Sequence, residues 1–218
     1  MNRGKVIWDP DKCVSCDTCI HVCRHLASPK IRWMDTKAVM KEIEPLLPYI
    51  EGITVSGGEC MEYADFLLEL FTEVKKKNKT CLIDSNGAFD FDLYPELMKV
   101  CDGVMLDVKA YDSKYHQWLT GMDNNIVLHN LSSLQKHGKL YEVRTVCCPG
   151  RHKENEETVR EVSKHLDPNI RYKLIKYRPF GVREEGLEKI GRTITDDKEI
   201  SALQKTAKRY GMKNIVIV

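Results

Sequence analysis

Residues 52–60 read Gly-Ile-Thr-Val-Ser-Gly-Gly-Glu-Cys, a short apolar run that ends in two glycines and a glutamate. The first four residues are rich in β-branched side chains, which favours a buried strand. Glycines directly after a strand allow another molecule to approach the backbone closely. A helical pattern follows, so we interpret this stretch as a strand–loop–helix unit of a parallel sheet.

The same alternation of strand and helix patterns continues to the end of the chain. In the helix that follows the quoted stretch, Phe66, Leu67, Leu70, Phe71 and Val74 recur at helical spacing. One or two helices separate each expected strand from the next, which is typical of βαβ units. We therefore predict the α/β class, with a partial (β/α) TIM-like barrel and a parallel sheet over residues 33–218.

The expected elements can be assigned to definite residues. The expected strands are Gly52–Val55, Thr80–Ile83, Gly103–Val108, Tyr141–Cys147, Arg171–Tyr177 and Asn214–Val218. The expected helices are Thr36–Ile50, Tyr63–Lys77, Leu93–Cys101, Ser113–Leu119, Ile126–His137, Asn155–Leu166 and Asp196–Tyr210. A βα barrel normally begins with a strand, whereas this series begins with a helix, so we expect a barrel that lacks its first strand.

Four of the nine cysteines are clustered near the start of the chain. Cys13, Cys16, Cys19 and Cys23 have the spacing C-x2-C-x2-C-x3-C, which bacterial ferredoxins use for a [4Fe–4S] cluster. The third closely spaced cysteine argues against zinc, which more often uses two separated pairs. We therefore predict a ferredoxin-like iron–sulfur segment at residues 1–32.

The role of the fourth cysteine has two interpretations. In two-cluster ferredoxins the last cysteine of such a run ligates the other cluster, and this sequence has no second run of the kind. Either Cys23 completes the same cluster, or half of a two-cluster module lies upstream of Met1. The ferredoxin pattern continues with proline, where this chain has Arg24.

Polar residues and glycines gather where the expected strands end. In a parallel barrel these ends meet at one face, which is where active sites form. Asp107 and Lys109 are two residues apart and share a face of their strand. Carboxylates, cations and open backbone together suit a zwitterionic ligand with an amine and a carboxylate. The candidate binding residues are Gly57, Gly58, Glu59, Asp84, Ser85, Asp107, Lys109, Arg144 and Arg178.

These motifs, in this order, resemble those of the activating enzymes of glycyl-radical enzymes, within the radical S-adenosylmethionine (SAM) superfamily. Ser56–Glu59 is similar to the Gly-Gly-Glu motif of the superfamily. Asp84–Gly87 resembles the Asp-Thr-Asn-Gly of pyruvate formate-lyase activating enzyme, and Leu106–Lys109 resembles its Leu-Asp-Leu-Lys. Val146–Gly150 is similar to its Val-Val-Pro-Gly, with Arg144 at the matching arginine.

The resemblance implies two cofactors, a [4Fe–4S] cluster and S-adenosyl-L-methionine. It implies that SAM is cleaved reductively and that a hydrogen atom is then taken from a glycine of a partner glycyl-radical enzyme. It also implies a flavodoxin- or ferredoxin-type electron donor. In the family, the first strand-end backbone and a glutamate, here Glu59, receive the methionine amino group. Arg178 falls where the relative has a histidine near the adenosyl group.

The sequence departs from the family in one respect. The family binds its catalytic cluster with C-x3-C-x2-C, and no cysteine here has partners at both +4 and +7. We expect this motif and the first strand to lie upstream of Met1, so we assign no catalytic residue. We also expect the 218-residue chain alone not to cleave SAM.

Three hypotheses about function remain open at this point. The first is a truncated or split activase of the radical SAM type. The second is an iron–sulfur electron-transfer or partner-binding module without catalysis of its own. The third is an unrelated α/β enzyme, such as an aldolase-like barrel that uses Lys109 as a Schiff base.

The other five cysteines have no ligand spacing. We expect Cys81 and Cys101 to be buried thiols, as most isolated cysteines are. Cys60 and one of Cys147 or Cys148 could face the strand ends, where a ligand or radical-relay role is the less favoured interpretation.

The charge balance argues against several partner classes. Lysine and arginine number 34 against 32 aspartates and glutamates, which leaves no basic footprint for nucleic acid or anionic lipid. The sequence contains no apolar run of about 18 residues, so it predicts no membrane span. Its first residues do not have the pattern of a signal peptide. Nine cysteines, four of them at ligand spacing, favour a reducing compartment, so we expect the cytoplasm.

Overall fold

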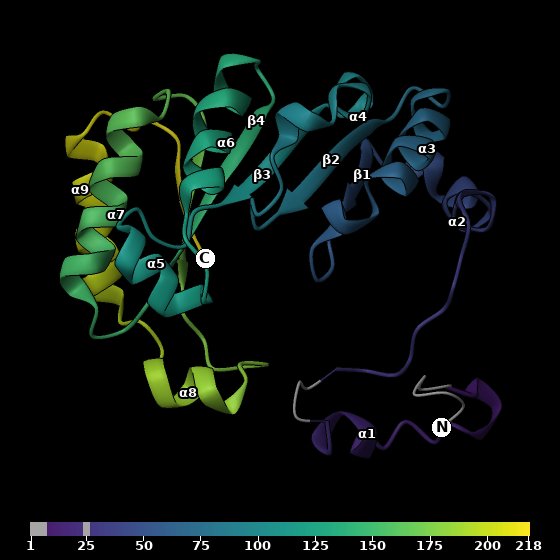
Figure 1. Cartoon of the computed structure of the whole chain (residues 1–218), viewed down its shortest axis with the longest axis horizontal. Helices are drawn as coiled ribbons and strands as arrows, with labels where there is room; N and C mark the ends of the chain where they lie inside the picture. The colour runs from purple at the N-terminus through teal and green to yellow at the C-terminus, as the bar shows by residue number, and fades with distance from the viewer. Residues whose placement is uncertain (1–7, 24–26) are drawn as a thin grey trace.

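The computed structural model describes residues 8–23 and 27–218. Its framework is a six-stranded sheet, in which every strand pairs in parallel with the next strand of the sequence (Figure 1). Within the described residues, β1 and β6 are the edges of this sheet, so the barrel is not closed. The predicted α/β class and partial parallel barrel are confirmed.

The helices and strands fall close to their expected positions. The strands are β1 Gly52–Val55, β2 Thr80–Ser85, β3 Gly103–Asp107, β4 Leu140–Cys147, β5 Arg171–Lys176 and β6 Ile215–Ile217. The α-helices are α1 Thr18–His21, α2 Thr36–Ile43, α3 Ala64–Lys75, α4 Pro95–Val100, α5 Ser113–Thr120, α6 Asn125–Lys136, α7 His152–His165, α8 Glu184–Ile190 and α9 Asp197–Arg209. The 3-10 helices are η1 Pro10–Lys12, η2 Glu44–Tyr49, η3 Cys60–Tyr63 and η4 Phe91–Leu93.

One expected helix is interrupted. The sequence pattern predicts a single helix over Thr36–Ile50, but α2 ends at Ile43 and the chain continues as the 3-10 helix η2. Pro45 and Pro48 lie in η2 and have no backbone N–H for an α-helical hydrogen bond. The tighter 3-10 turn therefore replaces the second half of the expected helix.

A short helix, α8, was missed by the sequence analysis. It spans seven residues, contains Gly186, and buries only Leu187 among its side chains. A helix this short gives no repeated apolar pattern, and glycine lowers helix propensity. Its position after β5 nevertheless affects the candidate site, because the β5–α8 loop carries Arg178.

One face of the sheet forms the hydrophobic core with the helices. Val104 and Leu106 of β3 and Val143 of β4 are fully buried in this core, together with Phe71 of α3 and Val159 of α7. Figure 1 shows the helices α3, α4, α6, α7 and α9 along the same outer side of the curved sheet. This packing fixes which side chains of each strand point to the other face.

The opposite, inner face of the sheet carries charged side chains. Successive strand residues point to opposite faces, so the neighbours of the core residues point inward. Five charged residues of β2, β3, β4 and β5 occupy such positions, and their side chains contact one another. They are Asp84, Asp107, Glu142, Arg144 and Lys173. Charges with so little access to water are costly unless they are paired, and this requirement organises the candidate site.

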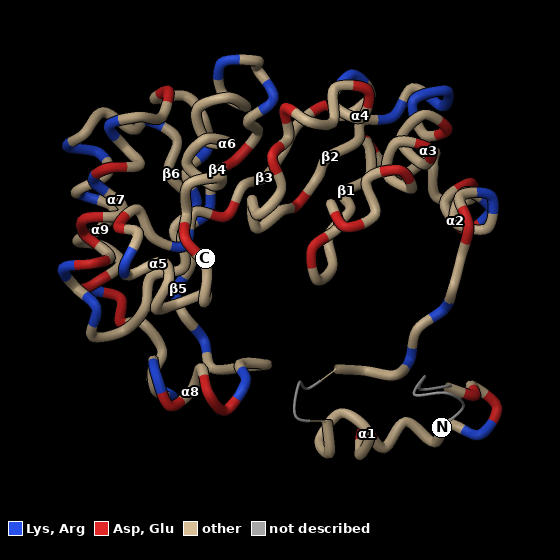
Figure 2. Tube along the Cα trace, in the orientation of Figure 1, with Lys and Arg blue, Asp and Glu red and all other residues tan. Residues whose placement is uncertain are grey.

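The cysteine segment precedes the sheet and is linked to α2 by the stretch 27–35, which has no regular structure (Figure 1). Figure 2 shows Lys and Arg interspersed with Asp and Glu along the helices, as expected from a net charge of +2. Among the described residues, no helix is both long and apolar enough to cross a membrane.

Candidate active site

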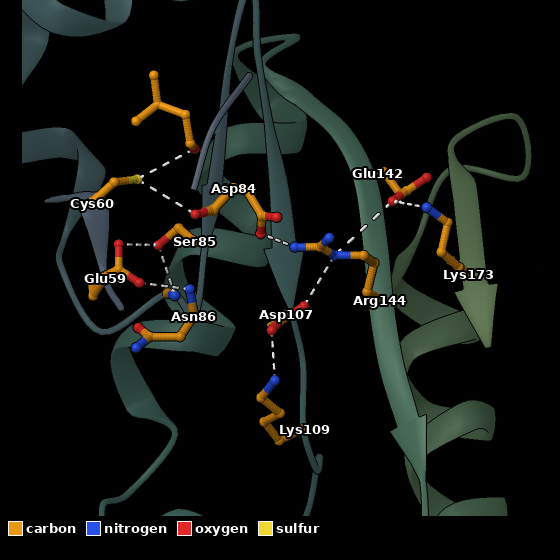
Figure 3. Close-up of polar contacts among 12 residues, drawn as sticks. Glu59, Cys60, Asp84, Ser85, Asn86, Asp107, Lys109, Glu142, Arg144 and Lys173 are labelled. Carbon is orange, nitrogen blue, oxygen red and sulfur yellow. Dashed lines mark hydrogen bonds and ion pairs between the residues drawn. The ribbon is translucent and has the colours of Figure 1, made fainter. Parts of the chain in front are cut away.

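Arg144 is at the centre of the polar contacts on the inner face (Figure 3). Its Nε donates to Oδ1 of Asp107 at 3.1 Å, and its Nη2 donates to Asp84. Lys109 donates from Nζ to the other oxygen of Asp107, at 2.5 Å. One arginine of β4 therefore connects the C-terminal ends of β2 and β3, and a lysine extends the chain of charges.

A second set of charges lies next to Arg144, toward the N-terminal end of β4. Glu142 is fully buried, with its Oε1 4.0 Å from Nε of Arg144 and 2.8 Å from Nζ of Lys173. Its other oxygen is 3.4 Å from Nη1 of Arg171. Burial lowers the pKa of Arg144 from its usual value, but arginine keeps its charge in proteins. The positive and negative groups thus stabilise one another across the four strands β2, β3, β4 and β5.

Glu59 is held by the neighbouring strand β2. Its Oε1 accepts from the Ser85 hydroxyl at 2.9 Å and from the Met61 amide at 3.1 Å. Its Oε2 accepts from the Asn86 amide at 2.7 Å. These bonds attach the loop after β1 to the end of β2, and they fix the position of the Glu59 carboxylate at the C-terminal edge of the sheet.

The two glycines before Glu59 leave their backbone open. Gly57 has a φ of +146°, a conformation that side chains rarely allow, and a Cβ added at Gly57 or Gly58 would meet no atom within 4 Å. Both glycines line a pocket together with Arg32 and Trp33, at the end of the stretch that leads from the cysteine segment. A ligand at the C-terminal edge could therefore contact this backbone directly.

The comparison with protein families identifies the framework. The family model described as "Radical SAM superfamily" matches residues 10–166, well over half of the chain. The chain belongs to the radical SAM superfamily. The family uses a [4Fe–4S] cluster and SAM.

Several curated relatives are activating enzymes of glycyl-radical enzymes. The (2S)-3-sulfopropanediol sulfolyase activating enzyme of Bilophila wadsworthia is 30% identical over 62% of this chain and 46% of its own length. The pyruvate formate-lyase-activating enzyme of Staphylococcus epidermidis is 30% identical over 67% of this chain and 63% of its own length. A Haemophilus influenzae protein named as a glycyl-radical enzyme activating enzyme is 26% identical over 100% of this chain and 90% of its own length. The chain thus spans less than two thirds of the first two relatives.

Solved structures confirm the fold of the radical SAM domain. A domain of pyruvate-formate lyase-activating enzyme from Bacteroides vulgatus has a TM-score of 0.61 at 16% identity, over 78% of this chain and 99% of that domain. SuiB of Streptococcus suis bound to SAM has a TM-score of 0.65 at 16% identity, over 89% of this chain and 45% of its own. At these identities the likeness concerns the fold alone.

The structure brings together most of the residues that the sequence predicts for the radical SAM site. Glu59 and Ser85 contact each other, and Asp84, Asp107 and Lys109 are joined through Arg144. Both aspartates accept hydrogen bonds from Arg144, and their predicted role toward a ligand amine stays a prediction. Arg178 is exposed after β5 and forms no hydrogen bond or ion pair with any described residue.

Three further residues contribute to this site and were missing from the predicted set. Asn86 binds Glu59 through its backbone amide, which a sequence does not reveal. Glu142 and Lys173 support Arg144 from β4 and β5. Their signal was available, because charged residues at alternate positions of otherwise apolar strands indicate a polar face.

The cysteine segment offers four thiols at the spacing that ferredoxins use for a [4Fe–4S] cluster. Cys16 and Cys19 are exposed, while Cys13 and Cys23 are half-buried. Polar contacts from the Trp8 side chain and the Ser15 backbone lower the pKa of Cys13, and contacts from the side chain and backbone of Thr18 lower that of Cys16. Iron binds the thiolate form, so these thiols are suited to ligation. The first seven residues and residues 24–26, Arg24 included, lie outside the described part.

The remaining five cysteines are unsuited to ligation. Cys60, Cys81, Cys101, Cys147 and Cys148 are all buried. Burial raises the pKa of Cys60 to about 11 and that of Cys147 to about 12, and it also raises the pKa of Cys148. A buried thiol with a raised pKa stays protonated and inert, so the structure gives no support to a ligand role at the strand ends.

Replacing Arg144 with methionine should destabilise the fold by about 2–3 kcal/mol. Breaking a buried ion pair costs roughly 3–5 kcal/mol, and we discount this because the carboxylates of Asp84 and Asp107 retain some exposure. Adding Asp84→Asn should restore part of the loss, because Asp84 then carries no unpaired charge. Urea denaturation followed by circular dichroism measures both effects.

The matched control is Arg32→Met. Arg32 forms a two-pronged ion pair with Glu42, at 2.6 and 2.9 Å, but both side chains are exposed and water screens the pair. The change in unfolding free energy should be much smaller than for Arg144→Met. Equal losses in the two variants would contradict the central position of Arg144.

Proposed function

We propose that this chain is the SAM-binding and partner-binding part of a glycyl-radical-enzyme activating enzyme. The observation that carries the proposal is the set of contacts at the C-terminal edge, where Glu59 and the Arg144 charges gather beside two open glycines. The activating enzymes among the relatives favour this function over other radical SAM reactions. Membership of the radical SAM superfamily also argues against the hypothesis of an unrelated, aldolase-like enzyme.

In the proposed SAM site, three groups of residues bind the amino group, the carboxylate and the adenosyl part of the ligand. The backbone at Gly57 and Gly58, with Glu59, would receive the methionine amino group. Lys109 and Arg144 are the cations that we propose for its carboxylate; each already binds a carboxylate of the protein. Arg178, which has no partner among the described residues, is available for the adenosyl part.

The proposed cluster ligands are Cys13, Cys16, Cys19 and Cys23. When bound, a [4Fe–4S] cluster supplies the electron for reductive cleavage of SAM. Because the 218 residues contain no C-x3-C-x2-C, we propose that the cysteine segment carries an electron-relay cluster. The role of the protein is to ligate and orient these groups and to exclude water.

A second candidate function follows from the same missing motif. An electron-transfer or partner-binding module would bind a cluster and a partner without cleaving SAM by itself. For either function, we propose a glycyl-radical enzyme as the protein substrate and a flavodoxin- or ferredoxin-type protein as the electron donor. Oxygen-sensitive ligands of this kind favour the cytoplasm as the compartment.

Anaerobic reconstitution with iron and sulfide should give one [4Fe–4S] cluster per chain. Replacing Cys13, Cys16 and Cys19 together with alanine should abolish the visible absorbance of the cluster, because these thiolates are its proposed ligands. Iron and sulfide analysis with absorption spectroscopy provides the measurement. The double variant Cys60→Ala/Cys148→Ala is the control and should keep the full cluster content, whereas an undiminished cluster in the triple variant would refute the ligand assignment.

Replacing Glu59 with glutamine should weaken SAM binding by about tenfold or more. A hydrogen bond to a charged group contributes roughly 1.5–3 kcal/mol, and about 1.4 kcal/mol corresponds to a tenfold change in Kd. Isothermal titration calorimetry of the reconstituted chain measures the binding. The control is Glu62→Gln, which removes an exposed carboxylate three residues away and should leave the Kd unchanged.

Gly58→Ala tests the same site from the side of the backbone. The added methyl group meets no protein atom within 4 Å, so only a ligand against the backbone would encounter it. We expect weaker SAM binding with unchanged stability. Unchanged affinity in both Glu59→Gln and Gly58→Ala would place the ligand elsewhere.

A further inference from the structure

A second pocket adjoins the candidate SAM site at Lys109. It has a volume of about 230 Å³ and is lined by residues of the loops after β2 and β3, of α5 and of the start of α6. An apolar cavity of about 150 Å³ in another protein binds benzene, so this pocket has room for one aromatic ring. It shares Asn86 and Lys109 with the candidate site described above, whereas its other lining residues lie outside that site.

One wall of the pocket is apolar. Met122, Ile126 and Val127 line it, and they come from the turn after α5 and from the first turn of α6. Val127 is buried, whereas Met122 is 63% exposed and Ile126 is 44% exposed. Large apolar side chains left open at the rim of a pocket are typical of a surface that contacts another molecule.

The lining of the pocket includes a buried histidine with one unused nitrogen. His116 is only 4% exposed, and its Nδ1 is 3.4 Å from the backbone oxygen of Ala110. A carbonyl oxygen can only accept, so Nδ1 carries the hydrogen and Nε2 is left with a lone pair. Burial lowers the pKa of His116, which keeps the ring neutral at pH 7.

Nε2 of His116 has no hydrogen-bond partner among the described residues. Because His116 lines the pocket, a ligand that donates a hydrogen bond to this free lone pair would gain affinity. The pocket therefore favours a group with an aromatic or apolar body and a neutral O–H or N–H at its tip. An anion is disfavoured at this position, because a lone pair repels negative charge.

The rim of the pocket offers hydrogen-bond donors suited to a peptide backbone. Lys109 and Asn86 both line the pocket, and both also belong to the candidate SAM site. Nζ of Lys109 uses one hydrogen for Asp107 and has others available. A side chain in the pocket would thus bring its own backbone next to the residues that are proposed to hold SAM.

We propose that this pocket binds the phenol group of a tyrosine, presented by a polypeptide partner beside Lys109. The phenol O–H donates to Nε2 of His116, and the ring packs against Met122, Ile126 and Val127. The existence of a polypeptide partner rests on the proposed function, whereas phenol binding by the pocket does not. The pocket would act as a specificity site, which holds the partner in register with the site at the strand ends.

The test compares p-cresol with toluene, which have the same ring and methyl group but differ in the hydroxyl. Both are titrated into the full chain labelled with ¹³C in the methionine methyl groups, and the Met122 signal is followed by NMR. We expect p-cresol to shift the Met122 signal saturably, with a Kd at least tenfold lower than that of toluene, because only p-cresol can donate to His116.

Two variants and a control separate the hydrogen bond from the pocket shape. His116→Phe should keep toluene binding, and the ratio of the Kd values for toluene and p-cresol should fall to about one. Ile126→Trp should fill the pocket and abolish the binding of both probes. Ile194→Trp, on an exposed residue outside the pocket, should leave both affinities unchanged.

Three results would overturn the proposal. They are equal affinities for p-cresol and toluene in the unmodified chain, an unshifted Met122 signal, and displacement of p-cresol by adenosine, which would make the pocket part of the nucleoside site. If His116→Phe fails to fold, the proposal is still tested by the ratio of affinities in the unmodified chain and by the effect of Ile126→Trp. SAM binding measured on the same sample distinguishes failure of the pocket from failure of the proposed function.

Discussion

The ion pairs of Arg144 are the constraint on which the rest of the inner face depends. Helices cover only one face of the parallel sheet, and the other face carries carboxylates on β2, β3 and β4 that have little contact with water. Such groups are stable only if each has a partner. Arg144 provides it for Asp84 and Asp107, and this pairing fixes the relative positions of the C-terminal strand ends.

This arrangement has a functional consequence, because the same pairing leaves a defined set of groups at the C-terminal edge. Glu59 is fastened to β2 by Ser85 and Asn86, so its carboxylate has one position relative to Lys109 and Arg144. Active sites require this kind of positioning before a ligand arrives. The pocket at His116 adjoins the site through Lys109, so a cofactor and a segment of a partner could be held on its two sides.

The sequence predicted the strands and helices better than it predicted the contacts among side chains. Gly52–Val55 was predicted residue for residue, because a Val- and Ile-rich run between turn signals has few alternatives. The helix at Thr36–Ile50 was only half right, since the prolines forced a 3-10 turn. The motifs predicted which residues share the C-terminal edge, but not that Arg144 binds Asp84 and Asp107. That pairing depends on strand register and on which face the helices cover, and neither follows from a local pattern.

The most direct test of the account is a crystal structure of the reconstituted chain grown with SAM. The account predicts that the methionine amino group lies against Glu59 and the backbone of Gly57 and Gly58. It also predicts that the ligand carboxylate lies on the side of Lys109 and Arg144, with the Arg144 ion pairs intact. A SAM molecule bound on the helix-covered face, or bound at the strand ends with its methionine group turned away from Glu59, would contradict the central claim.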